Sequence, residues 1–246
     1  MIHPTALISE GANLGSNVSV GPFSIIHDGV KIGSGSKIGS HCDIGVFSNM
    51  ASENTLVIGE DSHIRSHSIL YIGSSFGRAL TTGHRVTIRE NTISGINFQV
   101  GTLGDIQGDC VIGDYVRLHS NVHVGKSSKI GNFVWIFPFV VLTNDPHPPS
   151  DVCKGVTIGD FAVIATMSTI LPGIHISEGA LVGAQSLVNR DVSPDTIVAG
   201  VPAKVIGLTS RIKLTNPPGA DAYPWRRHFH RGYPEEIVAE WKAETF

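Results

Sequence analysis

Aliphatic residues recur at every sixth position along most of this chain. One run of eight extends from Ile2 to Ile44, a second run of eight from Val100 to Leu142, and a run of six from Ile158 to Val188. A period of six does not fit an α-helix, but it equals three strand periods of two. The pattern therefore predicts very short strands, one in each six-residue unit, joined by corners.

The residues around each aliphatic position suit such a corner. The next residue is often Gly, and the residue four places later is small or β-branched, as at Cys110, Val122 and Ser128. Glycine relieves crowding where the chain turns. Three units make a triangular coil of about eighteen residues, and stacked coils share one continuous core. We predict an all-β protein that forms a parallel β-helix prism with the aliphatic side chains inside.

Two segments break the pattern and predict loops outside the prism. Residues 73–87 are rich in Gly and Thr, and residues 143–157 contain three prolines. Proline interrupts strands, and insertions in solenoids lie on one face, often at the binding site. We assign residues 1–208 to the prism and 209–246 to a C-terminal extension. Pro234 and the acidic residues after it predict a short helix in this extension, ending near Glu244.

Composition narrows the class of protein. The formal net charge of −3 gives no electrostatic basis for nucleic-acid binding. The longest apolar run, 133–142, contains Pro138 and is too short to cross a membrane. No secretory signal is visible at the N-terminus, and the three cysteines show no paired spacing. We therefore expect a cytoplasmic protein with neither a nucleic-acid nor a membrane partner, and no bound metal.

The six-residue pattern, followed by Gly200-Val201-Pro202-Ala203-Lys204, resembles the left-handed β-helix acyltransferase family over residues 1–207. The resemblance implies left-handed winding and a homotrimer. It also implies coenzyme A, as an acyl-CoA cosubstrate rather than a permanent cofactor, in a groove between subunits. In this chain the matching cofactor-binding residues are Ala165, Ala184, Pro202 and Lys204.

The segment Thr143-Asn144-Asp145 resembles a loop of bacterial N-acetyltransferases that modify amino groups on nucleotide-linked sugars. The resemblance places Asn144 and Asp145 near the sugar amine. The following Pro-His-Pro departs from the family's usual residues, so we expect His147 to contact substrate without a catalytic role. Further candidates for substrate binding are Asn121, His84 and Arg85. A basic cluster at Arg226, Arg227, His228, His230 and Arg231 fits either phosphate binding or a solvated tail.

The stacking of coils predicts that one histidine lies beside one carboxylate. Residues one coil apart stack at about 4.8 Å, and Asp105 lies one coil before His123. A carboxylate beside an imidazole fixes one tautomer and makes the other nitrogen more basic. Acyl transfer uses such an arrangement for proton removal. We predict His123 and Asp105 as the catalytic pair, with an ordinary surface pair, or a base from the 143–157 loop, as alternatives.

The predicted activity is an acyl-CoA-dependent N-acyltransferase that transfers an acetyl or short acyl group to a nucleotide-linked amino sugar. An O-acetyltransferase acting on a sugar hydroxyl is a close alternative. A zinc enzyme of the γ-carbonic anhydrase type is another, with His84, His119 and His123 as ligands. A scaffold trimer without catalysis is a third. The 143–157 loop and the Gly-Val-Pro-Ala-Lys segment favour the acyltransferase.

Overall fold

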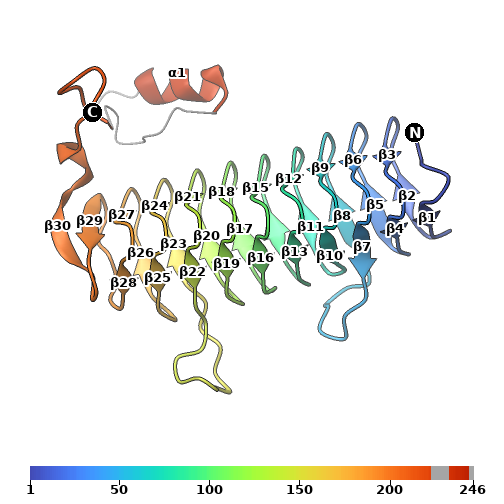
Figure 1. Ribbon diagram of the computed structural model, residues 1–246, viewed down its shortest axis with the longest axis horizontal. Coiled ribbons are helices and arrows are strands. Elements are labelled where there is room, and N and C mark those ends of the chain that lie inside the picture. The colour runs from blue at the N-terminus through green and yellow to red at the C-terminus, as the bar shows by residue number, and fades with distance from the viewer. Residues whose placement is uncertain (223–232, 244–246) are drawn as a thin grey trace.

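The computed structural model describes residues 1–222 and 233–243. This part of the chain winds into a long triangular prism of stacked coils, with one short helix beside it (Figure 1). The predicted all-β class and the parallel β-helix are confirmed. No helix within the described ranges is long and apolar enough to span a membrane.

Each coil contributes one strand to each of three sheets, which we call B, C and A in the order in which the chain visits them. Within the described residues, sheet B consists of β1 (Leu7–Ile8), β4 (Ile25–Ile26), β7 (Asp43–Val46), β10 (Ile69–Tyr71), β13 (Thr87–Ile88), β16 (Asp105–Ile106), β19 (His123–Val124), β22 (Val141–Leu142), β25 (Thr169–Ile170) and β28 (Leu187–Val188). Sheet C consists of β2 (Asn13–Leu14), β5 (Val30–Ile32), β8 (Leu56–Ile58), β11 (Ser75–Phe76), β14 (Ile93–Ser94), β17 (Val111–Ile112), β20 (Lys129–Ile130), β23 (Thr157–Ile158) and β26 (His175–Ile176).

Sheet A consists of β3 (Ser19–Val20), β6 (Lys37–Ile38), β9 (His63–Ile64), β12 (Thr81–Thr82), β15 (Gln99–Val100), β18 (Arg117–Leu118), β21 (Trp135–Ile136), β24 (Val163–Ile164), β27 (Leu181–Val182), β29 (Thr196–Ala199) and β30 (Lys204–Leu208). Neighbouring strands pair in parallel, except that β30 turns back and pairs antiparallel with β29. A single 3₁₀ turn, η1 (Thr209–Arg211), then leads away from the prism.

The core follows the six-residue pattern. Ile106, Val124 and Leu142 stack in sheet B and are completely buried. The small residue at each corner also points inward: Ser128 is buried, and its hydroxyl donates a hydrogen bond to the Gly125 carbonyl at 2.7 Å. Cys110 takes the same kind of position, and burial raises the pKa of its thiol to about 11. It therefore serves packing and not thiolate chemistry.

The glycine that follows each aliphatic residue is needed for a reason other than the crowding at the turn that the sequence suggests. Gly101 does not have a positive φ. A Cβ placed there would lie only 2.4 Å from the carbonyl carbon of His119 and the amide nitrogen of Ser120. The close approach of the next coil therefore requires glycine at this position. The left-handed residue of each corner comes two places later and is often not glycine, as at Leu103.

The loop predicted at 73–87 is wrong. These residues form β11, β12 and the beginning of β13 in regular coils. The prediction failed because Phe76, Thr82 and Ser94 occupy inward positions and are buried, so the run of aliphatic residues stops although the coils continue.

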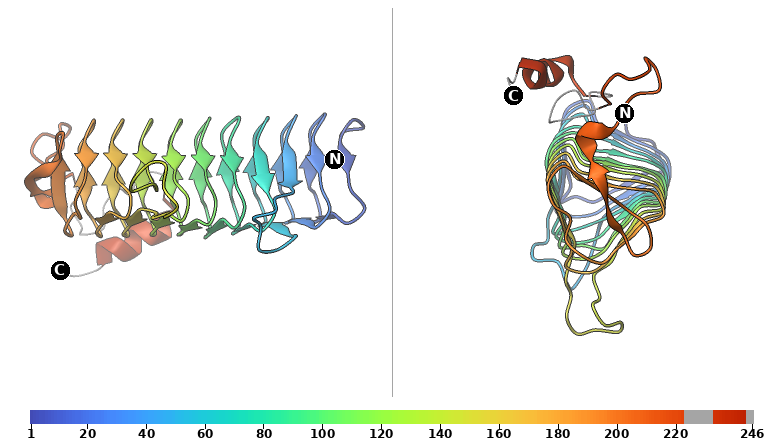
Figure 2. Two further views of the ribbon diagram at one scale, coloured as in Figure 1. Left: turned by 90° about the horizontal axis from the view of Figure 1, so that it is seen from below. Right: turned by 90° about the vertical axis from the view of Figure 1, so that its left-hand side faces the viewer.

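The prism is interrupted at residues 143–156, between β22 and β23, where the prolines of the sequence predict a loop. It is also interrupted at residues 47–55, between β7 and β8, where no loop was predicted. Both segments leave the corner between sheets B and C and project on the same side of the prism (Figures 1 and 2). The 47–55 loop is fastened by Asn91, whose side-chain oxygen accepts a hydrogen bond from the Ser52 amide and whose side-chain nitrogen donates one to the Met50 carbonyl.

The predicted C-terminal helix is confirmed as α1 (Glu235–Ala243). It lies on the opposite side of the prism from the two loops (Figure 2). Tyr115, Phe133 and Phe161 stack on successive coils with ring centroids 5.2 and 5.1 Å apart, and we call them the aromatic ladder. Trp241 of α1 meets Phe133 and Phe161 edge-on at 4.9 and 5.6 Å and is buried. The helix therefore packs on its own prism through this ladder.

The explanation for the corner glycines yields a stability prediction. Gly101→Ala should lower the free energy of unfolding by about 1–3 kcal/mol, because the added methyl group would press against backbone that has little room to move. Gly207→Ala is the matched control, since its nearest contact would be the Ile197 side chain at an ordinary 3.9 Å. Chemical denaturation measures both variants, and equal stability of the two would contradict the explanation.

Candidate active site

The pair predicted from the register is formed. His123 in β19 lies directly over Asp105 in β16, and His123 Nδ1 is 2.9 Å from Asp105 Oδ2. The hydrogen bond from His123 is the main cause of the lowered pKa of Asp105. Gln107, which donates to the same oxygen at 2.7 Å, and the charge of Arg89 act in the same direction. An ionised carboxylate only accepts hydrogen bonds, so His123 donates from Nδ1, and the neutral imidazole then has its lone pair on Nε2.

Asn144 lies at the base of the 143–156 loop, at the corner between sheets B and C. A Cβ on Gly125, which follows β19 at this corner, would lie 3.2 Å from Asn144 Oδ1. The side-chain nitrogen of Asn144 donates a hydrogen bond to Cys153 Sγ at 3.3 Å. The Asn144 carbonyl accepts a hydrogen bond from the Lys154 amide, which fixes the base of the loop. Asp145 and His147 lie farther along the loop and are exposed. Among the described residues, no contact joins Asn144, Asp145 or His147 to the His123–Asp105 pair of the same chain.

The remaining predicted residues lie along one edge of the prism, the corner between sheets A and B, which we call the AB edge. Asn121 occupies its left-handed position, with φ of 59°. His84 and Arg85 lie at this corner on coils nearer the N-terminus, and Ala165 and Ala184 lie at it on coils nearer the C-terminus. Lys204 pairs with Ala199, which continues the row of Ala165, and Pro202 is in the turn between them. The basic cluster of residues 226–231 is outside the described residues.

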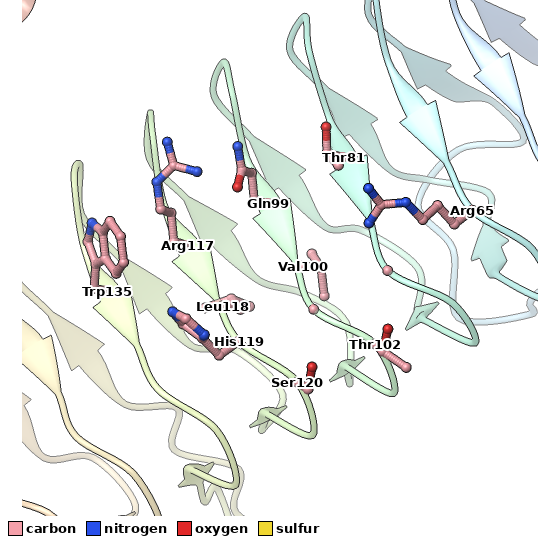
Figure 3. A pocket seen from close by; sticks show the side chains of 12 residues that line it. Arg65, Thr81, Gln99, Val100, Thr102, Arg117, Leu118, His119, Ser120 and Trp135 are labelled. Carbon is pink, nitrogen blue, oxygen red and sulfur yellow. The ribbon is translucent and has the colours of Figure 1, made fainter. Parts of the chain in front are cut away.

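A hollow of about 360 Å³ in sheet A borders the same edge. Its floor carries one row of outward side chains on successive strands, and Arg65 and His119 lie in the neighbouring row (Figure 3). The row consists of Thr81, Gln99, Arg117 and Trp135. None of the residues that line the hollow is acidic. Burial, followed by the charge of Arg117, lowers the pKa of His119, so its imidazole remains neutral near pH 7.

Sequence reasoning missed this hollow, although a signal for it was present. Gln99, Arg117 and Trp135 repeat at the same one-coil offset that relates Asp105 to His123. If the eighteen-residue offset had been applied to every outward position, it would have predicted that an arginine and a tryptophan lie side by side on sheet A.

The three histidines of the zinc alternative make separate contacts. His84 Nδ1 is 2.7 Å from the Ser66 hydroxyl, the His119 ring stacks on Phe137 at 4.7 Å, and His123 is held by Asp105. Across residues 1–222 and 233–243, no group of three or more His, Cys, Asp and Glu side chains is arranged to hold a metal ion. The single chain therefore offers no positive support for a zinc site.

A second histidine–carboxylate pair occurs near the N-terminal end. His27 Nε2 lies 2.6 Å from Asp43 Oδ1, beside a hollow lined by Phe47 and Asn54. The two pairs are similarly exposed: the side chains of His27 and Asp43 are 40% and 42% exposed, and those of His123 and Asp105 are 38% and 36% exposed. The two residues are sixteen apart, so the one-coil offset does not predict their contact. What distinguishes His123 is its surroundings: Asn121 lies at the AB edge on the same coil, and the 143–156 loop follows the next strand of its sheet.

Comparison with known proteins gives the family. The family described as "Bacterial transferase hexapeptide (six repeats)" matches residues 2–45. The acyl-[acyl-carrier-protein]–UDP-N-acetylglucosamine O-acyltransferase of Thermodesulfovibrio yellowstonii is 32% identical over 209 residues, covering 85% of this chain and 74% of the relative. The enzyme of the same name from Bartonella henselae is 30% identical over 213 residues, covering 84% and 69%. Serine acetyltransferase 4 of Arabidopsis thaliana is 40% identical over 95 residues, covering 36% and 24%.

Among solved structures, the UDP-N-acetylglucosamine acyltransferase of Arabidopsis superimposes with a TM-score of 0.71 at 23% identity, covering 85% of this chain and 74% of that one. This likeness concerns the fold and confirms the predicted left-handed β-helix. The repeats, the fold and the long matches to the bacterial enzymes show that the chain is an acyl-transferring enzyme that belongs to the left-handed β-helix acyltransferase family.

Proposed function

We propose that the protein transfers an acyl group from a thioester donor to the amino group of a nucleotide-linked sugar, with His123 as the base. The observation that supports this most is the orientation of His123. Asp105 holds its Nδ1 at 2.9 Å, which leaves the basic Nε2 free on a half-exposed face next to the AB edge. The long matches to acyltransferases whose names include UDP-N-acetylglucosamine support a nucleotide-linked sugar as acceptor.

In the proposed reaction, His123 takes up one proton and later releases it. The acceptor atom of the sugar attacks the thioester carbonyl carbon, and His123 Nε2 removes the proton from that atom. The ionised Asp105 stabilises the resulting imidazolium. When the intermediate collapses, the carbon–sulfur bond breaks, and the proton passes from His123 to the departing thiolate. We propose that Asn144, at the base of the 143–156 loop, orients the sugar.

We propose acyl-CoA as the donor. Ala165 and Ala184 have small side chains, so a narrow pantetheine arm could approach the backbone at these two positions of the AB edge. The positive charge of Lys204, at the C-terminal end of this edge, suits a phosphate group. The names of the bacterial relatives with long matches contain an acyl carrier protein instead. Thiol release measured with acetyl-CoA and with acetyl-carrier protein as donors distinguishes the two sources.

O-acylation is a second candidate because of the same His123–Asp105 pair. A neutral amine is already nucleophilic, whereas a hydroxyl group requires proton removal as it attacks. The relatives covering most of the chain are also named as O-acyltransferases. A UDP-linked amino sugar and its hydroxyl counterpart, supplied as alternative acceptors, decide between the two activities.

The central prediction concerns the two histidine–carboxylate pairs. His123→Ala should lower kcat by about 10²–10⁴-fold with little change in KM, because proton removal matters in the transition state. His27→Ala is the matched control, since its Asp43 contact and exposure are similar, and it should retain kcat. Steady-state thiol release measures both. Loss of activity in the His27 variant alone would move the active site to the N-terminal hollow.

The charge state of Asp105 makes a prediction about pH. Its pKa is lowered in the folded protein, mainly by the hydrogen bond from His123, so ionised Asp105 stabilises the fold at every pH above its unfolded value of about 3.9. That contribution disappears as the pH falls through the lowered, folded value. Unfolding measured from neutral to strongly acidic pH should therefore show wild type more stable than Asp105→Asn at pH 7, with the gap closing in acid. A gap that stays constant would contradict the assigned charge.

We also propose that the protein is a homotrimer. Phe23, Leu103, Phe139 and Met167 are large apolar residues at left-handed positions of the AB edge and are 49–61% exposed. Polar residues such as Arg85 and Asn121 occupy the corners between them. Exposed apolar side chains that recur along one edge are typical of a subunit interface. A neighbouring subunit at this edge could also supply the 143–156 loop, which leaves its own prism at a different corner.

The trimer proposal predicts that Leu103→Glu dissociates the assembly, because it would bury a charge in the interface. Ile93→Glu on sheet C, with a similarly exposed side chain, should have no effect on assembly. Light scattering coupled to size-exclusion chromatography measures the mass of each variant. A fully active monomer of the wild-type protein would refute the shared interface.

A further inference from the structure

The C-terminal extension contacts one of the residues that line the hollow in sheet A. Tyr233, two residues before α1, is buried against the aromatic ladder and meets Phe133 edge-on at 5.4 Å. Its hydroxyl accepts a hydrogen bond from Trp135 Nε1 and donates one to the Phe133 carbonyl at 3.3 Å. Trp135 is one of the residues that line the hollow. The extension thus holds a residue of the hollow from a distance of 98 positions along the chain.

Arg117 joins the two regions. Its guanidinium carbon lies 5.5 Å from the centre of the Trp135 ring and 5.3 Å from that of Tyr233. Cation–π contacts of this kind hold a guanidinium group in one orientation. Burial raises the pKa of Tyr233 to about 12, so its hydroxyl stays protonated at neutral pH. Burial also lowers the pKa of Arg117, but a guanidinium remains charged under all physiological conditions.

The chemistry of the hollow indicates what it accepts. Arg117 and Arg65 bring two guanidinium groups to a surface without a carboxylate, and Thr81, Thr102 and Ser120 add hydroxyl groups. The planar fork of arginine matches the oxygen atoms of a phosphate group, and the flat faces of Trp135 and His119 suit a ring next to it. Burial, followed by the charges of Arg65 and Lys37, lowers the pKa of His63, which pairs with Thr81 on the next strand of sheet A.

We propose that this hollow binds the phosphate-bearing part of a ligand through Arg117 and Arg65, and that Tyr233 is a positioning residue that fixes Arg117 and Trp135 for this task. The proposal rests on the proposed function for the source of the phosphate. That source is either the nucleotide-linked sugar or the coenzyme A donor, and both present a diphosphate. The hollow borders the AB edge, so a ligand whose phosphates lie there can extend its reactive group around the corner toward His123.

Calorimetric titration of the full-length protein with UDP and, separately, with coenzyme A tests the proposal without turnover. Arg117→Ala should weaken the binding of at least one probe by about 10–100-fold, the usual value of a charged hydrogen bond. Weaker binding of UDP assigns the hollow to the acceptor, and weaker binding of coenzyme A assigns it to the donor. Lys129→Ala, which removes a positive charge from exposed sheet C, is the control and should leave both affinities unchanged.

Tyr233→Phe tests the positioning role, because it keeps the ring on the aromatic ladder and removes only the hydroxyl. KM for the affected ligand should rise about threefold or more, while kcat and the melting temperature stay near the wild-type values. Arg117→Lys keeps the charge without the planar fork and should show an intermediate affinity, which provides a folded variant if Arg117→Ala is unstable.

The proposal is overturned if wild type binds neither probe, or if folded Arg117 variants bind both as tightly as wild type. Failure of the proposed function looks different: phosphate binding would depend on Arg117, but no acceptor would release thiol from a thioester donor.

Discussion

Backbone hydrogen bonds between successive coils are the constraint on which the rest of this molecule depends. They fix each strand of a sheet directly over the strand one coil earlier, as in the pairing of Asp105 with His123 and of Arg117 with Trp135. Side chains that are far apart in the sequence therefore meet at the strand spacing, without long-range folding of the chain. The histidine–carboxylate pair, the row on the floor of the hollow and the aromatic ladder all arise from this one geometric rule.

The same rule explains which features the sequence could predict. The His123–Asp105 contact was predictable because no insertion separates the two residues. The 73–87 segment was misjudged because Phe76 and Thr82 fill inward positions that are usually aliphatic. The His27–Asp43 contact joins residues in different rows, so no counting rule finds it. The docking of α1 depends on aromatic residues at the left-handed positions of the corners. The six-residue pattern does not constrain these positions, so it could not predict the contact.

Two chemically different faces meet at the AB edge. On sheet B, an ionised Asp105 orients His123, the base that we propose. Sheet A offers positive charge, where Arg117 is held between two aromatic rings. A ligand with an anionic end and a reactive end can use both faces only by lying across the corner between them. Ala165 and Ala184 add little side-chain volume to this corner, and for this reason we propose the edge as the path of the elongated acyl donor.

The most direct test of this account is a crystal structure of the protein with an acyl-CoA analogue in which a methylene group replaces the thioester sulfur. The account predicts that the pantetheine arm follows the AB edge past Ala184 and Ala165. The acyl carbonyl should then lie where an acceptor atom can contact both it and His123 Nε2, with reacting atoms about 3–3.5 Å apart. An acyl group bound beside His27 and Asp43, or on sheet C, would contradict the account.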